Sequence, residues 1–153
     1  MFLETSIFNH YFDIDRKEHN STVKLFEEIN LGTYEPFTSI YVVAEIEQAH
    51  EPKRENMLGL IDKFNIKVLD ESEKSIKLAM LYIENKIIPE KYLIDAIHIS
   101  IATVNSMDMI ISTNFQYIVK DKTRIFTNLI NESLSYYPIK ILSPKEIFKN
   151  DNI

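Results

Sequence analysis

Three acidic residues lie in stretches of the sequence that are otherwise apolar. Glu4 directly follows the apolar N-terminal residues, Glu45 interrupts the apolar run 40–46, and Asp95 lies near the start of the apolar run 93–102. Each alone is most simply structural, as a strand end or an acid near a helix N-terminus. Two carboxylates about 4 Å apart, however, repel by about 4 kcal/mol at an effective dielectric constant of about 20. If the three acids share one pocket, either protonation or a divalent cation must relieve that repulsion.

The composition narrows the kind of metal. The chain of 153 residues has no cysteine, which excludes thiolate zinc sites, iron–sulfur clusters, disulfides and cysteine nucleophiles. All-oxygen ligands favour Mg²⁺ or Mn²⁺ as the cofactor. Only two glycines, Gly32 and Gly59, are present, so glycine-rich phosphate loops and dinucleotide fingerprints are excluded as well.

Short apolar runs alternate with amphipathic segments along the chain. The runs predict strands at 1–3, 34–38, 67–69, 109–112 and 139–142. Helices are predicted to begin at Ser21 or Thr22, Ser39, Pro52, Ser72, Lys91 and Thr123, with a last helical turn opened by Pro144. This alternation predicts an α/β fold of three layers, α/β/α, with a central, mostly parallel sheet.

The predicted fold offers a way to bring the acids together. In such a sheet, the strand C-termini and the following helix N-termini meet at one edge, where ligands bind. Glu4 follows the first strand, Asp95 lies in a helix first turn, and Asn114 follows the strand at 109–112. Glu45 completes the cluster if its helix reaches the same edge.

Four segments, spread in order from Met1 to about Pro144, resemble those of a known family. They are a strand followed by an acid (FLETS, 2–6), a helix with a glutamate (VAEI, 43–46), a helix with an N-terminal aspartate (DAIHISIA, 95–102) and a strand leading into Ser/Thr-x-Asp/Asn (MIISTNF, 109–115). In this order and spacing they resemble the PIN-domain nucleases, which include the VapC-type toxins of toxin–antitoxin pairs.

The resemblance implies a function and a role for each matching residue. The function is divalent-metal-dependent hydrolysis of phosphodiester bonds in RNA, without a covalent enzyme intermediate. Glu4, Glu45 and Asp95 would bind the metal. Asn114 would complete the catalytic set, directly or through water, with Ser6 and Ser112 supporting these ligands from behind. The resemblance also implies a homodimer and, for a toxin, an antitoxin protein as partner.

Two departures from the family pattern keep an alternative open. Glu4 stands where aspartate is usual, and the neutral Asn114 stands where aspartate is frequent; fewer negative ligands weaken cation binding. The alternative is therefore a weak or inactive PIN-like domain that binds RNA or a protein partner. A third reading is a signalling or ligand-binding α/β domain with structural acids. His98 could be a ligand or a proton carrier, but its place on an apolar helix favours a hydrogen-bonded core role.

Charge is distributed unevenly along the chain. The net charge of −6 argues against a protein that coats nucleic acid non-specifically. Residues 1–114 carry 11 basic and 19 acidic side chains, whereas residues 115–149 carry six basic and three acidic ones. Lys120, Lys122 and Arg124 follow closely after Asn114, so a nucleic-acid backbone leaving the acidic pocket could run along them; an ordinary solvated helix start explains them equally well.

The organisation of the chain is simple. Its length fits one domain over 1–153, without repeats or a Pro/Gly-rich linker. The N-terminal residues lack the pattern of a secretory signal, and no apolar stretch approaches the ~18 residues of a membrane span. We therefore expect a cytoplasmic protein that does not enter a membrane.

Overall fold

Five short strands form one parallel sheet in the order β3-β2-β1-β4-β5. The computed structural model describes residues 1–149. The strands are β1 (Phe2–Leu3), β2 (Phe37–Ser39), β3 (Lys67–Leu69), β4 (Met109–Ile111) and β5 (Lys140–Leu142). β1 lies at the centre, where Phe2 is in register with Phe37 of β2 and with Ile110 of β4. The order reverses direction at β1, so the edge beyond β1 and β4 is a topological switch point.

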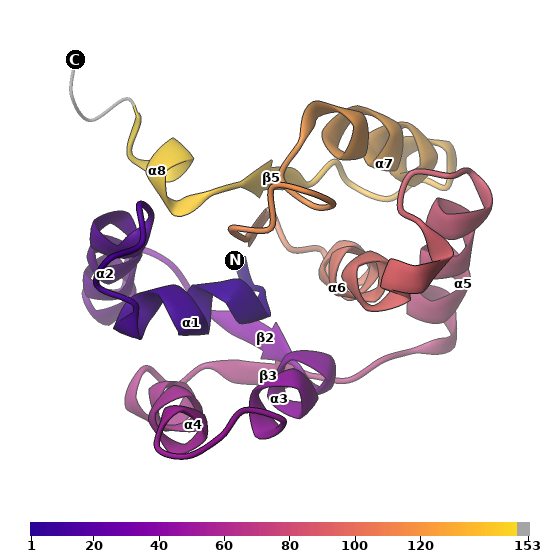
Figure 1. Cartoon of the computed structure of the whole chain (residues 1–153). Helices are drawn as coiled ribbons and strands as arrows, with labels where there is room; N and C mark the ends of the chain where they lie inside the picture. The colour runs from indigo at the N-terminus through magenta and orange to yellow at the C-terminus, as the bar shows by residue number, and fades with distance from the viewer. Residues whose placement is uncertain (150–153) are drawn as a thin grey trace.

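Helices cover both faces of this sheet (Figure 1). The first half of the chain forms α1 (Thr5–Phe12), α2 (His19–Asn30), α3 (Ile40–Glu47) and α4 (Lys53–Lys63). The second half forms α5 (Glu73–Glu84), the 3₁₀ turn η1 (Glu90–Tyr92), α6 (Leu93–Val104), α7 (Asp121–Ser133) and the short α8 (Pro144–Ile147). The predicted three-layer α/β/α class with a parallel sheet is therefore confirmed.

Local predictions differ from the structure in three places. No helix was expected at Thr5–Phe12, where α1 lies. α2 begins at His19, ahead of the expected Ser21 or Thr22; the Thr22 hydroxyl lies inside the helix and donates to the carbonyl of Glu18 (2.7 Å) instead of capping the helix. The expected strand at 34–38 pairs only from Phe37 on, since Pro36 has no N–H to donate to a neighbouring strand.

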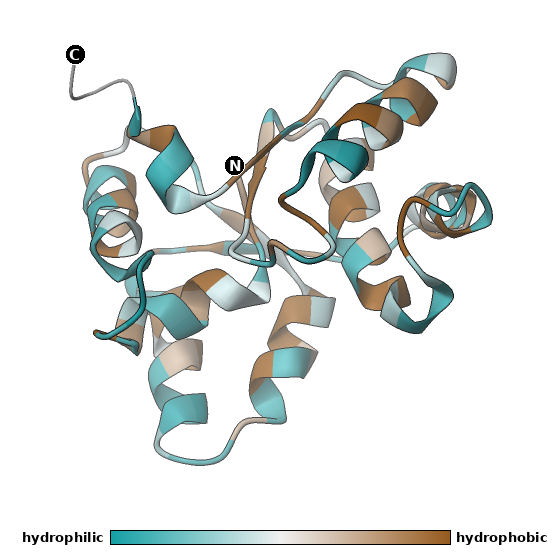
Figure 2. Ribbon diagram, turned by 45° about the horizontal axis from the view of Figure 1, so that its top comes forward, coloured by the Kyte–Doolittle hydropathy of each residue, from teal (hydrophilic) through white to brown (hydrophobic). Residues whose placement is uncertain are grey.

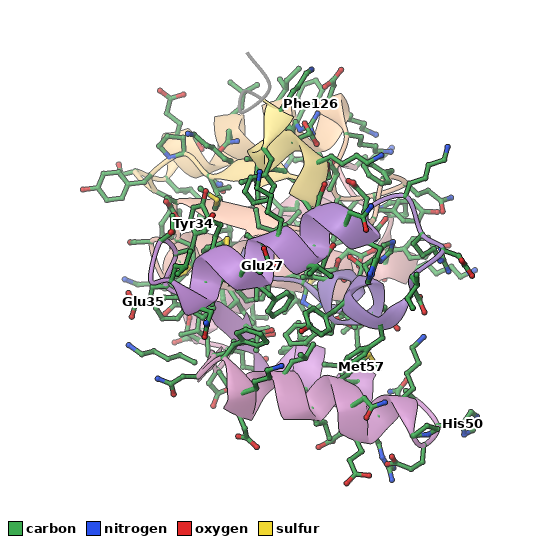
Figure 3. All side chains as sticks on the ribbon, turned by 90° about the vertical axis from the view of Figure 1, so that its left-hand side faces the viewer. Glu27, Tyr34, Glu35, His50, Met57 and Phe126 are labelled. Carbon is green, nitrogen blue, oxygen red and sulfur yellow. The ribbon has the colours of Figure 1, made fainter. Side chains whose placement is uncertain are left out.

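The hydrophobic core lies on both faces of the central strands. Figure 2 shows hydrophobic residues concentrated in the centre, and Phe2 and Leu3 of β1 have no exposed surface. Residues 96–103 of α6 are all buried, so this helix is central, as its apolar sequence predicts. On the opposite face, Met57 points from α4 into the layer formed with α1 and α2 and is 2% exposed (Figure 3).

Hydroxyl side chains begin several helices. The Ser39 hydroxyl accepts a hydrogen bond from the backbone N–H of Val42 (3.3 Å) and caps α3, as predicted. Ser72 and Ser75 form a capping box at the start of α5.

Among residues 1–149, no helix has the length and apolar character needed to cross a bilayer.

Replacing Ser39 by alanine should destabilise the helix that carries Glu45. Ser39 is fully buried, and loss of its cap should lower the free energy of unfolding by about 0.5–2 kcal/mol in urea titrations followed by circular dichroism. Ser133→Ala is the control, because the hydroxyl of Ser133 is exposed and donates only to the carbonyl of Ile130. Equal losses in the two variants would show that the Ser39 cap does not stabilise α3.

Candidate metal centre

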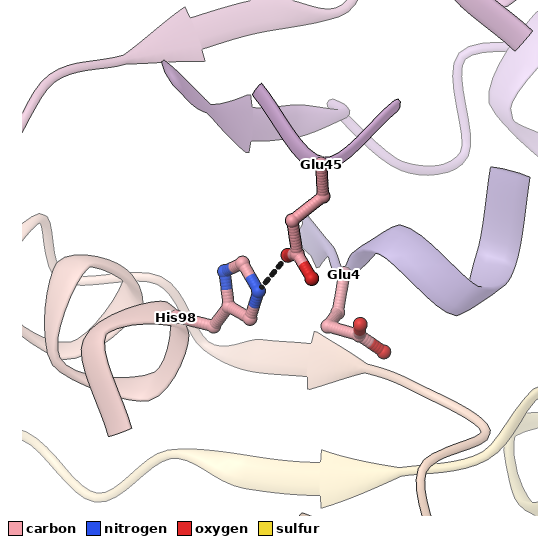
Figure 4. A group of neighbouring side chains, drawn as sticks. All are labelled: Glu4, Glu45 and His98. Carbon is pink, nitrogen blue, oxygen red and sulfur yellow. Dashed lines mark hydrogen bonds and ion pairs between the residues drawn. The ribbon is translucent and has the colours of Figure 1, made fainter. Parts of the chain in front are cut away.

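The predicted site residues come from four separate elements. Glu4 follows β1, Glu45 lies on α3, Asp95 is in the first turn of α6, and Asn114 follows β4. β1 and β4 are hydrogen-bonded neighbours, so Glu4 and the residues after β4 share one edge of the sheet. The two helices reach the same edge, and Figure 4 shows Glu4 and Glu45 side by side with His98 of α6.

Glu4 is a buried carboxylate held by three donors. It is 5% exposed and is the N-cap of α1, where its Oε2 accepts from the Ser6 backbone N–H (3.2 Å). Its Oε1 accepts from the Ser6 hydroxyl (2.6 Å) and from the Ser112 hydroxyl at the end of β4. Burial of a charged group is tolerated because these bonds satisfy it.

The same two serines fix the loop after β4. The Ser6 hydroxyl accepts from the backbone N–H of Thr113 (2.8 Å), and the Ser112 hydroxyl accepts from that of Asn114 (2.9 Å). Each serine therefore joins Glu4 to this loop, a position consistent with the supporting role that the sequence predicts for them.

Glu45 is held from one side and open on the other. Its Oε1 accepts from the Thr5 hydroxyl (2.7 Å) and from Nε2 of His98 (2.7 Å), as Figure 4 shows for His98. Its side chain is 40% exposed, whereas that of His98 has no exposed surface. The Oε2 atom of Glu45 makes no hydrogen bond within residues 1–149, which leaves it available to a ligand.

His98 and Glu45 stabilise each other's charged forms. Burial lowers the pKa of His98, but its hydrogen bond to Glu45 and the charges of Glu4, Glu45 and Asp95 outweigh that effect, so the pKa of His98 is raised. Burial likewise raises the pKa of Glu45, but His98 and the Thr5 hydroxyl lower it overall. The Nδ1 atom of His98 is buried without a partner, so a protonated ring leaves one N–H unsatisfied there.

Asp95 faces the same cluster from the first turn of α6. Burial, together with the charges of Glu4 and Glu45, raises the pKa of Asp95 to about 6, and the charge of His98 opposes this shift. Asn114 donates from Nδ2 to Oδ2 of Asp95 (3.2 Å), while its Oδ1 accepts from the backbone N–H of Tyr117 (3.0 Å). Both polar atoms of the Asn114 amide are therefore in use within the protein.

The donor set fits a divalent cation. Glu4, Glu45 and His98 each offer one ligand atom, and these atoms lie within 4.8 Å of one another. Asp95, predicted as the third ligand, lies outside this compact group but within electrostatic reach of it. None of the three acids forms an ion pair with lysine or arginine in the described part of the chain, and Glu45 has His98 as its positively ionisable partner.

His98 belongs to the cluster, although its apolar neighbours in the sequence favoured a hydrogen-bonded role in the core. It has both properties: its ring is fully buried 6.2 Å from the ring of Phe2, and its Nε2 reaches the acids. The spacing Asp95-x-x-His98, which places both residues on one helix face, is the signal that could have identified it.

The three predicted nucleic-acid-binding cations separate in the structure. Arg124 pairs through its guanidinium with both carboxylate oxygens of Glu146 (2.8 Å each) and also contacts Asp121 (3.3 Å). Lys122 is exposed and has no ion-pair partner in residues 1–149, and Lys120 lies 5.7 Å from the centre of the Tyr117 ring. Only the two lysines thus remain available to an external anion.

No protein-family model matches the chain, and no curated protein matches it significantly. The function must therefore be argued from the residues of the site.

Replacing Asp95 by asparagine should stabilise the protein in EDTA. The pKa of Asp95 rises from its ordinary 3.8 to about 6 on folding, so the ionised form destabilises the fold above about pH 6. We expect a gain of about 1–2 kcal/mol near pH 7.5, allowing for solvent screening, and almost none near pH 4, where the carboxyl is largely protonated in both states.

Urea titrations at the two pH values measure this difference. Asp15→Asn is the control, since Asp15 is exposed in the loop before α2 and makes no hydrogen bond or ion pair within residues 1–149. A stabilisation of Asp95→Asn that does not change with pH would contradict the proposed cause.

Proposed function

We propose that the protein is a divalent-metal-dependent nuclease that hydrolyses phosphodiester bonds of RNA. The observation that carries the proposal is the gathering of Glu4, Glu45 and Asp95 at one sheet edge without a lysine or arginine partner among residues 1–149. Such a cluster is electrostatically unfavourable alone and favourable with a divalent cation. The order of the four sequence segments that resemble PIN-domain nucleases supports the choice of reaction.

Each residue has a role in this proposal that follows from its contacts. Glu45 offers its unpaired Oε2 to the cation, and His98 and Thr5 hold the other oxygen in place. Glu4 is fixed by Ser6 and Ser112, so its position does not depend on the ligand. Asp95 adds a third negative charge once it loses its proton. When bound, Mg²⁺ or Mn²⁺ would acidify a water molecule and offset the negative charge that develops on the scissile phosphate.

A second candidate is a PIN-like domain that binds RNA or a protein without cutting. Asn114 favours this candidate, because its neutral amide adds no negative charge to the site. Its nitrogen already donates to Asp95, and its oxygen already accepts from Tyr117. A site with three acids holds a cation less tightly than one with four.

Cleavage assays separate the two candidates. Wild type should cut single-stranded or structured RNA in Mn²⁺ or Mg²⁺ and should stop in EDTA. Glu45→Gln removes a ligand charge and should reduce the rate by at least about 100-fold. Glu47→Gln is the matched control, since Glu47 is exposed on the same helix.

The outcomes are distinct. Cleavage that persists in EDTA or in Glu45→Gln would identify a contaminant and refute the nuclease. Mn²⁺ binding by wild type without any cleavage would support the second candidate. Loss of activity in Glu47→Gln as well would indicate damage to α3 instead of loss of a ligand.

The resemblance also supports a toxin role, as a homodimer with an antitoxin partner. Expression of wild type should then arrest bacterial growth, whereas expression of Glu45→Gln should not. Growth arrest by both proteins to the same extent would contradict a toxin that acts through cleavage.

A further inference from the structure

A second feature near the acidic cluster is a cavity of about 410 Å³ between the end of α5, the segment leading to η1, and the start of α7. Its lining includes three lysines, Lys86, Lys120 and Lys122, and one carboxylate, Glu90. Its apolar wall includes Ile88, which is fully buried. No lysine of this set forms an ion pair within residues 1–149.

The three lysines give this cavity a positive charge, although the net charge of the chain is −6. Lys67, by contrast, pairs with Glu35 (2.8 Å). Here Glu90 offers one negative charge against three positive ones. A cavity with this balance attracts an anion, since its apolar wall strengthens the field of the lysines.

The cavity is connected to the acidic cluster through one turn. Tyr117 lines the cavity, and its backbone N–H donates to Asn114, which in turn donates to Asp95. The ring of Tyr117 stacks on Tyr92 at 3.9 Å, and Tyr92 directly precedes α6 and its Asp95. Tyr117 is the third residue after Asn114, and three residue steps span at most about 11 Å. A single nucleic-acid strand can therefore reach both places.

We propose that the Lys86–Lys120–Lys122 cavity binds a phosphate of the RNA strand next to the phosphate at the metal centre. This inference rests on the proposed function for the identity of the strand. Lys86 is thereby assigned to RNA binding, although it is far from Lys120 in the sequence. Arg124 is not, because its guanidinium is paired with Glu146. Lysines that follow the backbone carry affinity without base specificity.

Lys86 offers a variant that separates folding from binding. Its backbone lies in the left-handed region (φ 57°), which glycine adopts at lower cost. Lys86→Gly should therefore keep or raise the melting temperature while it removes a phosphate contact. Lys122→Gln removes a second charge from the exposed first turn of α7. Lys145→Gln is the matched control, since Lys145 is exposed on α8 and does not line the cavity.

The test is a fluorescence-anisotropy titration of a labelled single-stranded RNA of about twelve nucleotides, in EDTA so that no cleavage occurs. We expect Lys86→Gly and Lys122→Gln each to weaken binding about fivefold and to reduce the salt slope by about 0.7, with Lys145→Gln unchanged. Equal affinity of all four proteins, or no binding by wild type, would overturn the proposal. So would Lys86-dependent binding of inorganic phosphate with unchanged RNA affinity, which would indicate a site for free phosphate.

This result is independent of the test of cleavage. Metal-dependent cleavage, with RNA affinity unchanged in Lys86→Gly and Lys122→Gln, would refute the cavity as a phosphate site but not the proposed nuclease activity. Lysine-dependent RNA binding without cleavage would support the cavity as a binding site and refute the nuclease.

Discussion

The burial of the Glu4 carboxylate at the end of the central strand is the constraint on which this site depends. Glu4 caps α1, and the hydroxyls of Ser6 and Ser112 join it to the loop after β4. One side chain thus connects β1, α1 and the segment that carries Asn114. Because a buried carboxylate without donors costs several kcal/mol, this network must form as a unit, and it fixes the sheet edge at which the other acids gather.

Within the cluster, the ionised form of Asp95 opposes folding. Burial and its acidic neighbours raise the pKa of Asp95, while a buried His98 is the one ionisable group of positive sign that contacts Glu45 in the described chain. A protein selected only for stability would place a lysine or an apolar residue there. Ionisable groups with shifted pKa values that gather in one place are typical of functional sites.

Much of the fold was predictable because its signals are local. The apolar runs at β3, β4 and β5 and the caps Ser39 and Ser72 depend on neighbours in sequence. α1 was not predictable, because glutamate rarely caps a helix and the two residues after it, Thr5 and Ser6, are weak helix formers. Burial of Ile7 and Phe8 against the sheet stabilises that helix, which is a tertiary effect.

Charged residues that are neighbours in the sequence do not all face the same surface of the fold. Lys120, Lys122 and Arg124 form one basic group in the sequence, but Arg124 turns toward Glu146, 22 residues later, and Lys86 joins the two lysines from the end of α5. The faces of α7 separate in the same way: Thr123, Thr127 and Asn131 are buried, with Asn131 bonded to Tyr82, while Ile125, Phe126 and Leu129 are exposed. Hydrophobic periodicity predicts that a helix exists, but only the partners across the fold decide which side it buries and which charges stay free to bind. The net charge of −6 is therefore compatible with both an acidic metal centre and a basic cavity beside it.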